Sequence, residues 1–113
     1  MPQNNDTRPI EWVTADIIRQ HFNKSQFYER MLTGEFKIYL KRSSHPETPP
    51  KGEPYCTRSQ IAFYYTFDGD LVAVVHQYLR SDGTIGASGK PDPKRLYLED
   101  RILSVKTEVN NNP

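Results

Sequence analysis

The sequence predicts an α+β fold, with one or two short N-terminal helices packed on an antiparallel sheet of three to five strands. Three observations support this prediction. Apolar residues between positions 13 and 32 recur at helical spacing, and from position 35 the pattern changes to alternation. Further along, Asp68-Gly69 separates two apolar runs, which is typical of a β-hairpin.

The first helix is expected to begin at Ala15 and to continue through Phe22, with Thr14 as its N-cap. Val13 and Ile18 are spaced as a hydrophobic staple around this cap. Residues 23–25 then interrupt the pattern. The chain therefore forms either one kinked helix or two short ones.

A second helical stretch is expected from Gln26 to Thr33. Ser25 is its expected cap, because a serine hydroxyl accepts hydrogen bonds from the free amides of a first helical turn. Gly34 follows the last turn, where a left-handed residue commonly ends a helix.

Residues 36–41 predict a strand, because Phe36, Ile38 and Leu40 alternate with polar or charged neighbours. The apolar side chains should face the core. Residues 43–57 contain four of the nine prolines and predict an irregular loop.

Residues 60–67 and 71–79 predict a central hairpin. A two-residue turn would place Phe67 opposite Asp70. The same register sets the other expected pairs, which are Tyr65 with Val72, Phe63 with Val74, and Ile61 with His76. Both faces of this pair are apolar, so the hairpin should lie in the middle of the sheet.

The C-terminal third predicts two more turns. Residues 81–83 should lead into a short strand over 84–87, and Pro91-Asp92-Pro93 should form a rigid turn. Residues 96–105 should add a last strand, or a tight hairpin that turns at residues 99–101.

Length and charge limit the possible functions. The 113 residues suffice for one domain, which we place at residues 10–106, with disordered tails at 1–9 and 107–113. The 15 basic and 14 acidic residues nearly cancel, which disfavours a nucleic-acid partner without excluding it. The single cysteine, Cys56, allows no internal disulfide. No apolar segment is long enough for a membrane span, and the expected location is the cytoplasm.

Residues 76–95 are the most probable place for a site in a rigid scaffold, because they leave an apolar strand and enter a loop rich in glycine, proline and charge. His76, Tyr78 and Arg80 share one strand face. They could supply a general base and charge stabilisation for RNA cleavage, although a histidine on a half-buried strand is more often structural.

Other motifs in this region are incomplete. Residues 86–90, Gly-Ala-Ser-Gly-Lys, lack the spacing and the Ser or Thr of a phosphate loop, so they favour a connector over an anion-binding turn. No two histidines have metal-ligand spacing, and the sequence predicts no metal and no cofactor.

A second set of residues suggests binding. Tyr39 and Tyr64 alternate with core residues and should be exposed near Lys41 and Arg42. Lys90, Lys94 and Arg95 flank the two prolines of the rigid turn, which could hold these cations in a fixed arrangement; we include Arg95 in the binding set. Surfaces that combine aromatic and basic residues bind either single-stranded nucleic acid or proteins, and the balanced charge favours proteins.

Two functions follow. The first is a non-catalytic protein-interaction module that uses the proline loop and the 80–95 loop. The second is an RNA-binding or RNA-cleaving domain, with His76 as base and Arg80, Lys90 and Lys94 stabilising phosphate charge. Two short helices followed by an antiparallel meander with His, Arg and Lys resemble the layout of small bacterial RNA-cleaving toxin domains, and this resemblance implies the second function. The sequence leaves the oligomeric state open.

Overall fold

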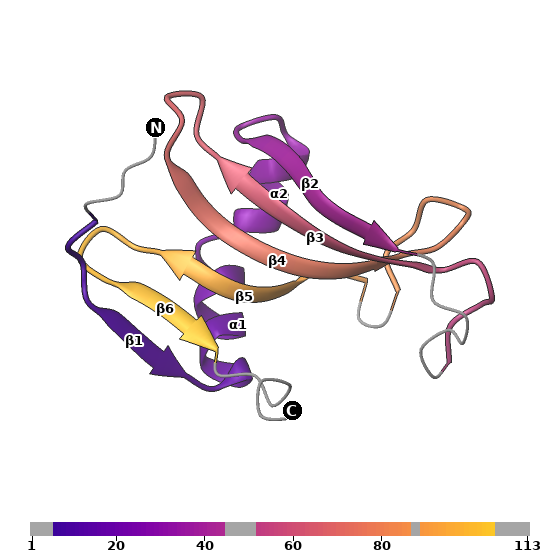
Figure 1. Cartoon of the computed structure of the whole chain (residues 1–113), viewed down its shortest axis with the longest axis horizontal. Helices are drawn as coiled ribbons and strands as arrows, with labels where there is room; N and C mark the ends of the chain where they lie inside the picture. Colours follow the sequence, from indigo (N-terminus) through magenta and orange to yellow (C-terminus); the bar gives the residue numbers. More distant parts are fainter. Residues whose placement is uncertain (1–5, 45–51, 87–88, 106–113) are drawn as a thin grey trace.

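A computed structural model describes residues 6–44, 52–86 and 89–105. The chain forms an α+β domain in which two helices lie behind one six-stranded sheet (Figure 1). In chain order the elements are β1 (Ile10–Val13), α1 (Ala15–Lys24), α2 (Phe27–Leu32), β2 (Lys37–Ser44), β3 (Arg58–Tyr65), β4 (Leu71–Leu79), β5 (Asp92–Tyr97) and β6 (Ile102–Val105). The predicted fold class is confirmed.

The sheet is larger than predicted and is mixed. Its strand order is β1-β6-β5-β4-β3-β2, and β1 pairs with β6 in parallel while the other neighbours are antiparallel. The prediction missed β1 because its four residues are too few to show a pattern, and because Val13 was assigned only to the helix cap. The strand depends on its partner, with Ile10 opposite Ile102.

The two helices are separate, and the local signals place the first correctly. The Thr14 hydroxyl accepts a hydrogen bond from the Ile17 amide at 3.2 Å, as an N-cap does. The prediction for Ser25 is wrong: it ends α1, and Gln26 precedes α2 in a left-handed conformation with φ of 53° and no side-chain cap. Gly34 has the expected positive φ, 87°.

The β3–β4 hairpin is central, as predicted, but its turn differs. Ile61 faces His76 as expected. The two-residue turn is wrong, because the Thr66 amide donates to the Asp70 carbonyl at 2.8 Å and three residues lie between them. Gly69 supplies the positive φ of 96° that such loops need, and a register shift after Tyr64 absorbs the extra residue.

The longer turn also decides which of the other predicted residue pairs form in this hairpin. Phe63 faces Val74 as predicted, whereas Tyr65 faces Leu71 instead of Val72. The predicted pair of Phe67 and Asp70 does not form, because residue 67 belongs to the turn.

The segment around Pro93 is a strand and not the predicted rigid turn. β5 begins at Asp92, and its register against β4 shifts between Val74 and Val75. Pro93 lies at this irregularity, where a missing amide hydrogen is tolerated, and its side chain is fully buried.

Two other C-terminal predictions have different outcomes. The expected strand over 84–87 is reduced, within the described residues, to one isolated bridge between Leu79 and Ile85. The expected tight hairpin after Leu96 is confirmed, since the Leu98 amide donates to the Arg101 carbonyl at 2.8 Å between β5 and β6.

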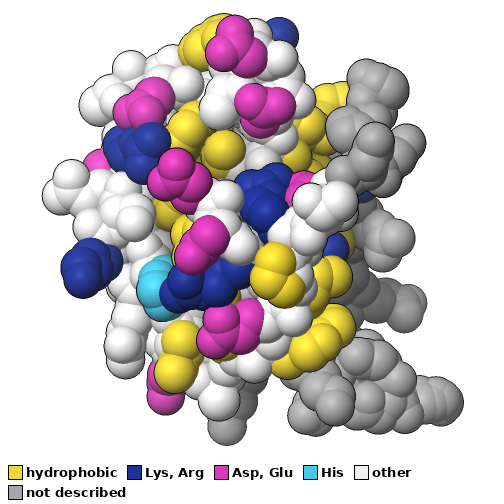
Figure 2. All heavy atoms as spheres, turned by 90° about the vertical axis from the view of Figure 1, so that its left-hand side faces the viewer, with side chains coloured by type: hydrophobic (Ala, Val, Ile, Leu, Met, Phe, Trp, Pro, Cys, Tyr) yellow, Lys and Arg dark blue, Asp and Glu magenta, His cyan; other side chains and the backbone are white. Residues whose placement is uncertain are grey.

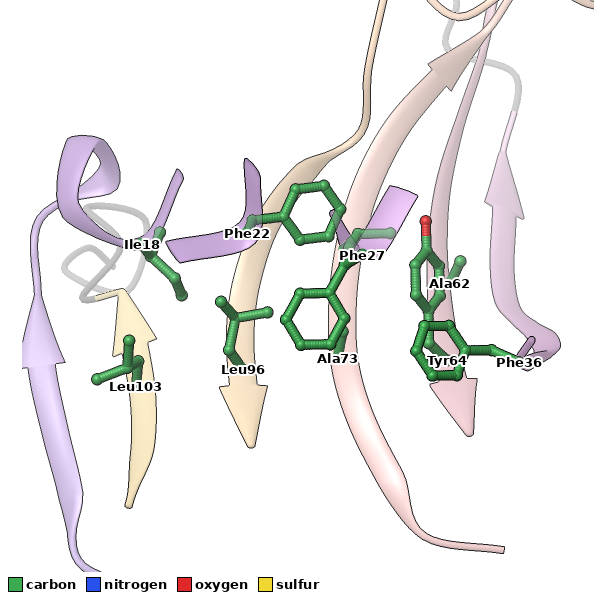
Figure 3. Close-up of a cluster of buried hydrophobic side chains, with 10 residues drawn as sticks. Ile18, Phe22, Phe27, Phe36, Ala62, Tyr64, Ala73, Leu96 and Leu103 are labelled. Atoms are coloured by element: carbon green, nitrogen blue, oxygen red, sulfur yellow. The ribbon is translucent and has the colours of Figure 1, made fainter. Parts of the chain in front are cut away.

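The core lies between the helices and the back of the sheet (Figure 3). Aromatic rings form a chain across it: Phe22 stacks on Phe27 with centroids 5.8 Å apart, and Phe36 stacks on Tyr64 at 6.0 Å. Each large apolar side chain buried here contributes roughly 1.5–3 kcal/mol. Ile38 and Leu40 lie opposite the core residues Tyr64 and Ala62 and so face the core side as predicted, but on edge strand β2 they stay 40% and 48% exposed.

Candidate interaction surface on the open sheet face

One face of the sheet is not covered by any helix among the described residues. Both helices lie on the opposite side, so the strands face the viewer of Figure 1 directly. We call the uncovered side the open face. Since side chains alternate along a strand, the residues next to each core residue point to the open face.

The open face is rich in aromatic side chains. Phe63 and Tyr65 stack on β3 with centroids 6.4 Å apart. Strand register adds aromatic residues from the other strands, and these are Tyr39, Tyr78, Tyr97 and Trp12. At the two edge strands Tyr39 is 59% and Trp12 60% exposed, so the aromatic surface extends across the sheet.

His76 lies on the same face and is half-buried. Its Nε2 is 2.8 Å from the Ser59 hydroxyl, and its ring meets Tyr78 edge-on with centroids 4.7 Å apart. Burial lowers the pKa of His76, and Lys94 lowers it further while Asp92 opposes both. The neutral ring is therefore favoured, as a general base requires.

The other predicted catalytic residues do not gather as one group around this histidine. Arg80 donates to Glu53 at 2.8 Å, and the Lys90 ammonium is 3.2 Å from a Glu29 oxygen on α2. Of these three cations only Lys94 affects the pKa of His76, and the Lys94 ammonium also contacts the Asp92 carboxylate at 3.1 Å. All three proposed phosphate-binding cations are thus engaged with carboxylates.

The predicted binding residues also do not lie together on one surface. Tyr64 is fully buried in the core, so its predicted exposure is wrong, whereas Tyr39 is exposed as expected. Lys41 is exposed at a β-bulge in β2, and the side chain of Arg42 lies outside the described residues. Arg95 lies on the open face opposite Val74 of β4.

The structure describes the two loops of the interaction hypothesis in part. Residues 45–51 of the proline loop and 87–88 of the glycine-rich loop lie outside the described residues. The described parts are held together, because the Glu53 carboxylate, 6% exposed, bonds Arg80 and packs against Gly86. Cys56 is free and exposed.

A groove of about 1010 Å³ lies at the turn end of the open face. Its floor includes Arg95, Tyr65 and Tyr97, and the segment before β1 and the two hairpin turns enclose it. Figure 2 views the molecule from this end and shows acidic and basic side chains among hydrophobic ones. The alternation Phe63-Tyr64-Tyr65 could have indicated this aromatic floor if the covered side had been known.

Arg8 lies in the groove but is neutralised. It forms two hydrogen bonds to the Asp6 carboxylate, at 2.9 and 2.6 Å, and donates to the Leu98 carbonyl at 2.7 Å. The hydrogen bonds that the Arg8 side chain and amide donate to Asp6 lower the pKa of this carboxylate to about 2. The guanidinium also lies 5.6 Å from the centre of the Tyr97 ring.

Within the described ranges, no group of three or more His, Cys, Asp or Glu residues could hold a metal ion. No helix in the described part of the chain has the length and apolar character to cross a membrane. Comparisons with protein-family models, curated proteins and solved structures find no match to this chain.

Proposed function

We propose that the protein is a non-catalytic protein-interaction module, located in the cytoplasm, which binds a partner protein on the open face. The observation that carries the proposal is the set of partly exposed aromatic side chains that five of the six strands place on the open face, from Trp12 on β1 to Tyr39 on β2. Exposed apolar side chains gathered on one face mark interaction sites, and Tyr, Trp and Arg are enriched where binding energy concentrates.

The charge distribution favours a protein over a nucleic acid. The net charge is only +1, and acidic residues accompany the basic ones around the groove, including Asp70 and Glu99. Binding to phosphates requires a basic excess, because its affinity comes largely from counterion release. A mixed rim suits a protein partner that carries both signs of charge.

Photo-crosslinking in the cells that naturally produce the protein tests this proposal. A benzophenone amino acid replaces Tyr39 in one variant, Trp12 in a second and Gln20 on helix α1 in a control. We expect discrete protein adducts from the two open-face positions and none from Gln20. Adducts to RNA at the open face, or equal protein adducts at all three positions, would contradict the proposal.

An RNA-cleaving function is the second candidate, and one observation favours it. Burial and Lys94 lower the pKa of His76 on the open face, and its Nε2 lies 2.8 Å from the Ser59 hydroxyl. Cleavage of a fluorescent RNA by the purified protein, abolished in His76→Gln and retained in Arg80→Gln, would support it. No cleavage above a buffer blank would remove it.

A further inference from the structure

Arg95 differs from the other half-buried cations in the partner of its charge. Six Lys or Arg side chains in the described part of the chain are half-buried, and these are Arg8, Arg30, Arg80, Lys94, Arg95 and Arg101. Five of them have a carboxylate within 4 Å. Arg95 has none among the described residues; it donates only to the neutral Ser104 hydroxyl, at 3.3 and 3.4 Å.

The guanidinium of Arg95 lies where a ligand bound in the groove could contact it. It lines the floor of the groove beside Tyr65 and Tyr97, and the backbone of β5 between β4 and β6 fixes its position. Half-buried charges are costly unless paired, and arginine pairs with carboxylates through two parallel hydrogen bonds. Within the described ranges, the guanidinium of Arg95 therefore lacks the carboxylate partner that the other five cations have.

The rim of the groove carries the opposite charge. Asp70 and Glu99 are exposed there, at the turns before β4 and β6. Arg8 adds no free positive charge, because Asp6 holds it in a bidentate pair. The groove thus presents a cation at its floor, aromatic rings beside it and carboxylates at its edge.

We propose that this groove binds an extended segment of the partner protein that presents a Glu or Asp side chain to Arg95, between apolar residues that contact Tyr65 and Tyr97. Lys or Arg residues flanking that segment would lie near Asp70 and Glu99. The charge complementarity of floor and rim carries this inference, which rests on the proposed function and specifies the chemistry of its partner. A phosphate backbone suits the groove less, since the rim repels it.

A matched pair of peptides tests the carboxylate directly. The probes are acetyl-Lys-Phe-Glu-Phe-Lys-amide and the same peptide with Gln in place of Glu, each titrated into isotope-labelled protein and followed by amide NMR shifts. We expect the Glu peptide to shift residues around Tyr65, Arg95 and Tyr97, and to bind about tenfold more tightly than the Gln peptide. Equal affinities, or shifts confined to other parts of the sheet, would overturn the inference.

Protein variants complete the test. Arg95→Gln should bind both peptides equally and weakly, whereas Lys24→Gln, which removes the same charge from the exposed end of α1, should keep the tenfold difference. Competition by adenosine monophosphate at concentrations that leave the Gln peptide unaffected would identify phosphate as the anion and overturn the inference. Protein adducts at Tyr39 combined with no Glu preference would retain the proposed function and reject only this site.

Discussion

Replacing Tyr64 with phenylalanine should stabilise the protein, although Tyr64 is the largest side chain in the core. Its ring is fully buried against Phe22 and Phe36, and its hydroxyl has no hydrogen-bond partner among the residues that the structure describes. An unpaired buried polar group costs roughly 1–3 kcal/mol. The void left by one oxygen atom, on the order of 10 Å³, costs only about 0.3 kcal/mol.

We therefore expect Tyr64→Phe to raise the free energy of unfolding by about 1–2 kcal/mol, which for a domain of this size raises Tm by roughly 4–8 °C per kcal/mol. Urea denaturation followed by far-ultraviolet circular dichroism measures it. Tyr39→Phe, at an exposed position, is the control and should change stability by less than about 0.5 kcal/mol. A loss of stability in Tyr64→Phe would refute the reasoning, because it would mean that the hydroxyl has a partner.

Alkaline pH gives an independent check of the same group. Burial, and to a smaller extent Tyr28, raise the pKa of Tyr64 above its ordinary value. The unfolded state then loses the phenolic proton first, so stability should fall as pH rises above about 10. Tyr64→Phe should lose this part of the alkaline dependence. An unchanged slope would show that the phenol titrates equally in both states.

Three further predictions concern the open face, the 80–86 turn and the helix junction. The His76 pKa should lie below its ordinary value in a ring-proton NMR titration, so acidification below about 6.5 should reduce stability, and Lys94→Gln should move the pKa upward; a downward move would contradict the geometry. Gly86→Ala places a Cβ 2.7 Å from the Glu53 carboxylate, so it should destabilise the protein in thermal unfolding and do so less in a Glu53→Ala background; equal losses would reject this contact. Gln26→Gly should stabilise the protein by up to roughly 1 kcal/mol in urea denaturation, because it relieves a left-handed conformation, and destabilisation would show that the side chain has a role.

The open face shows why the sequence predicted the fold better than the site. The Asp68-Gly69 turn and the period of two located β3 and β4, because local pattern and turn chemistry act within a few residues. Phe63, Tyr64 and Tyr65, however, are chemically alike, and alternation says only that the middle one points away from its neighbours.

The side of the sheet that the helices cover is decided by contacts between residues that lie far apart in the sequence. Phe22 and Phe27 on the helices and Phe36 before β2 enclose Tyr64, and this leaves Phe63 and Tyr65 on the open face. This packing buries Tyr64, which belongs to the predicted binding set, and leaves exposed aromatic residues that the prediction did not select. In a sheet of this kind the docking of the helices decides which residues remain on the open face, and under the proposed function these are the candidate binding residues.

That Arg95 has no carboxylate partner among the described residues follows from the same tertiary arrangement. Its neighbours in the sequence, Asp92 and Lys94, pair with each other at 3.1 Å, and the next acidic residues, Glu99 and Asp100, lie beyond Tyr97 in the following turn. A sequence whose 15 basic and 14 acidic residues nearly cancel thus yields a folded sheet with one uncompensated guanidinium among the half-buried cations of the described residues. Local charge balance in a sequence does not ensure charge pairing in the fold, and a cation left without its counter-ion on an aromatic surface is the feature from which a partner's chemistry can be inferred.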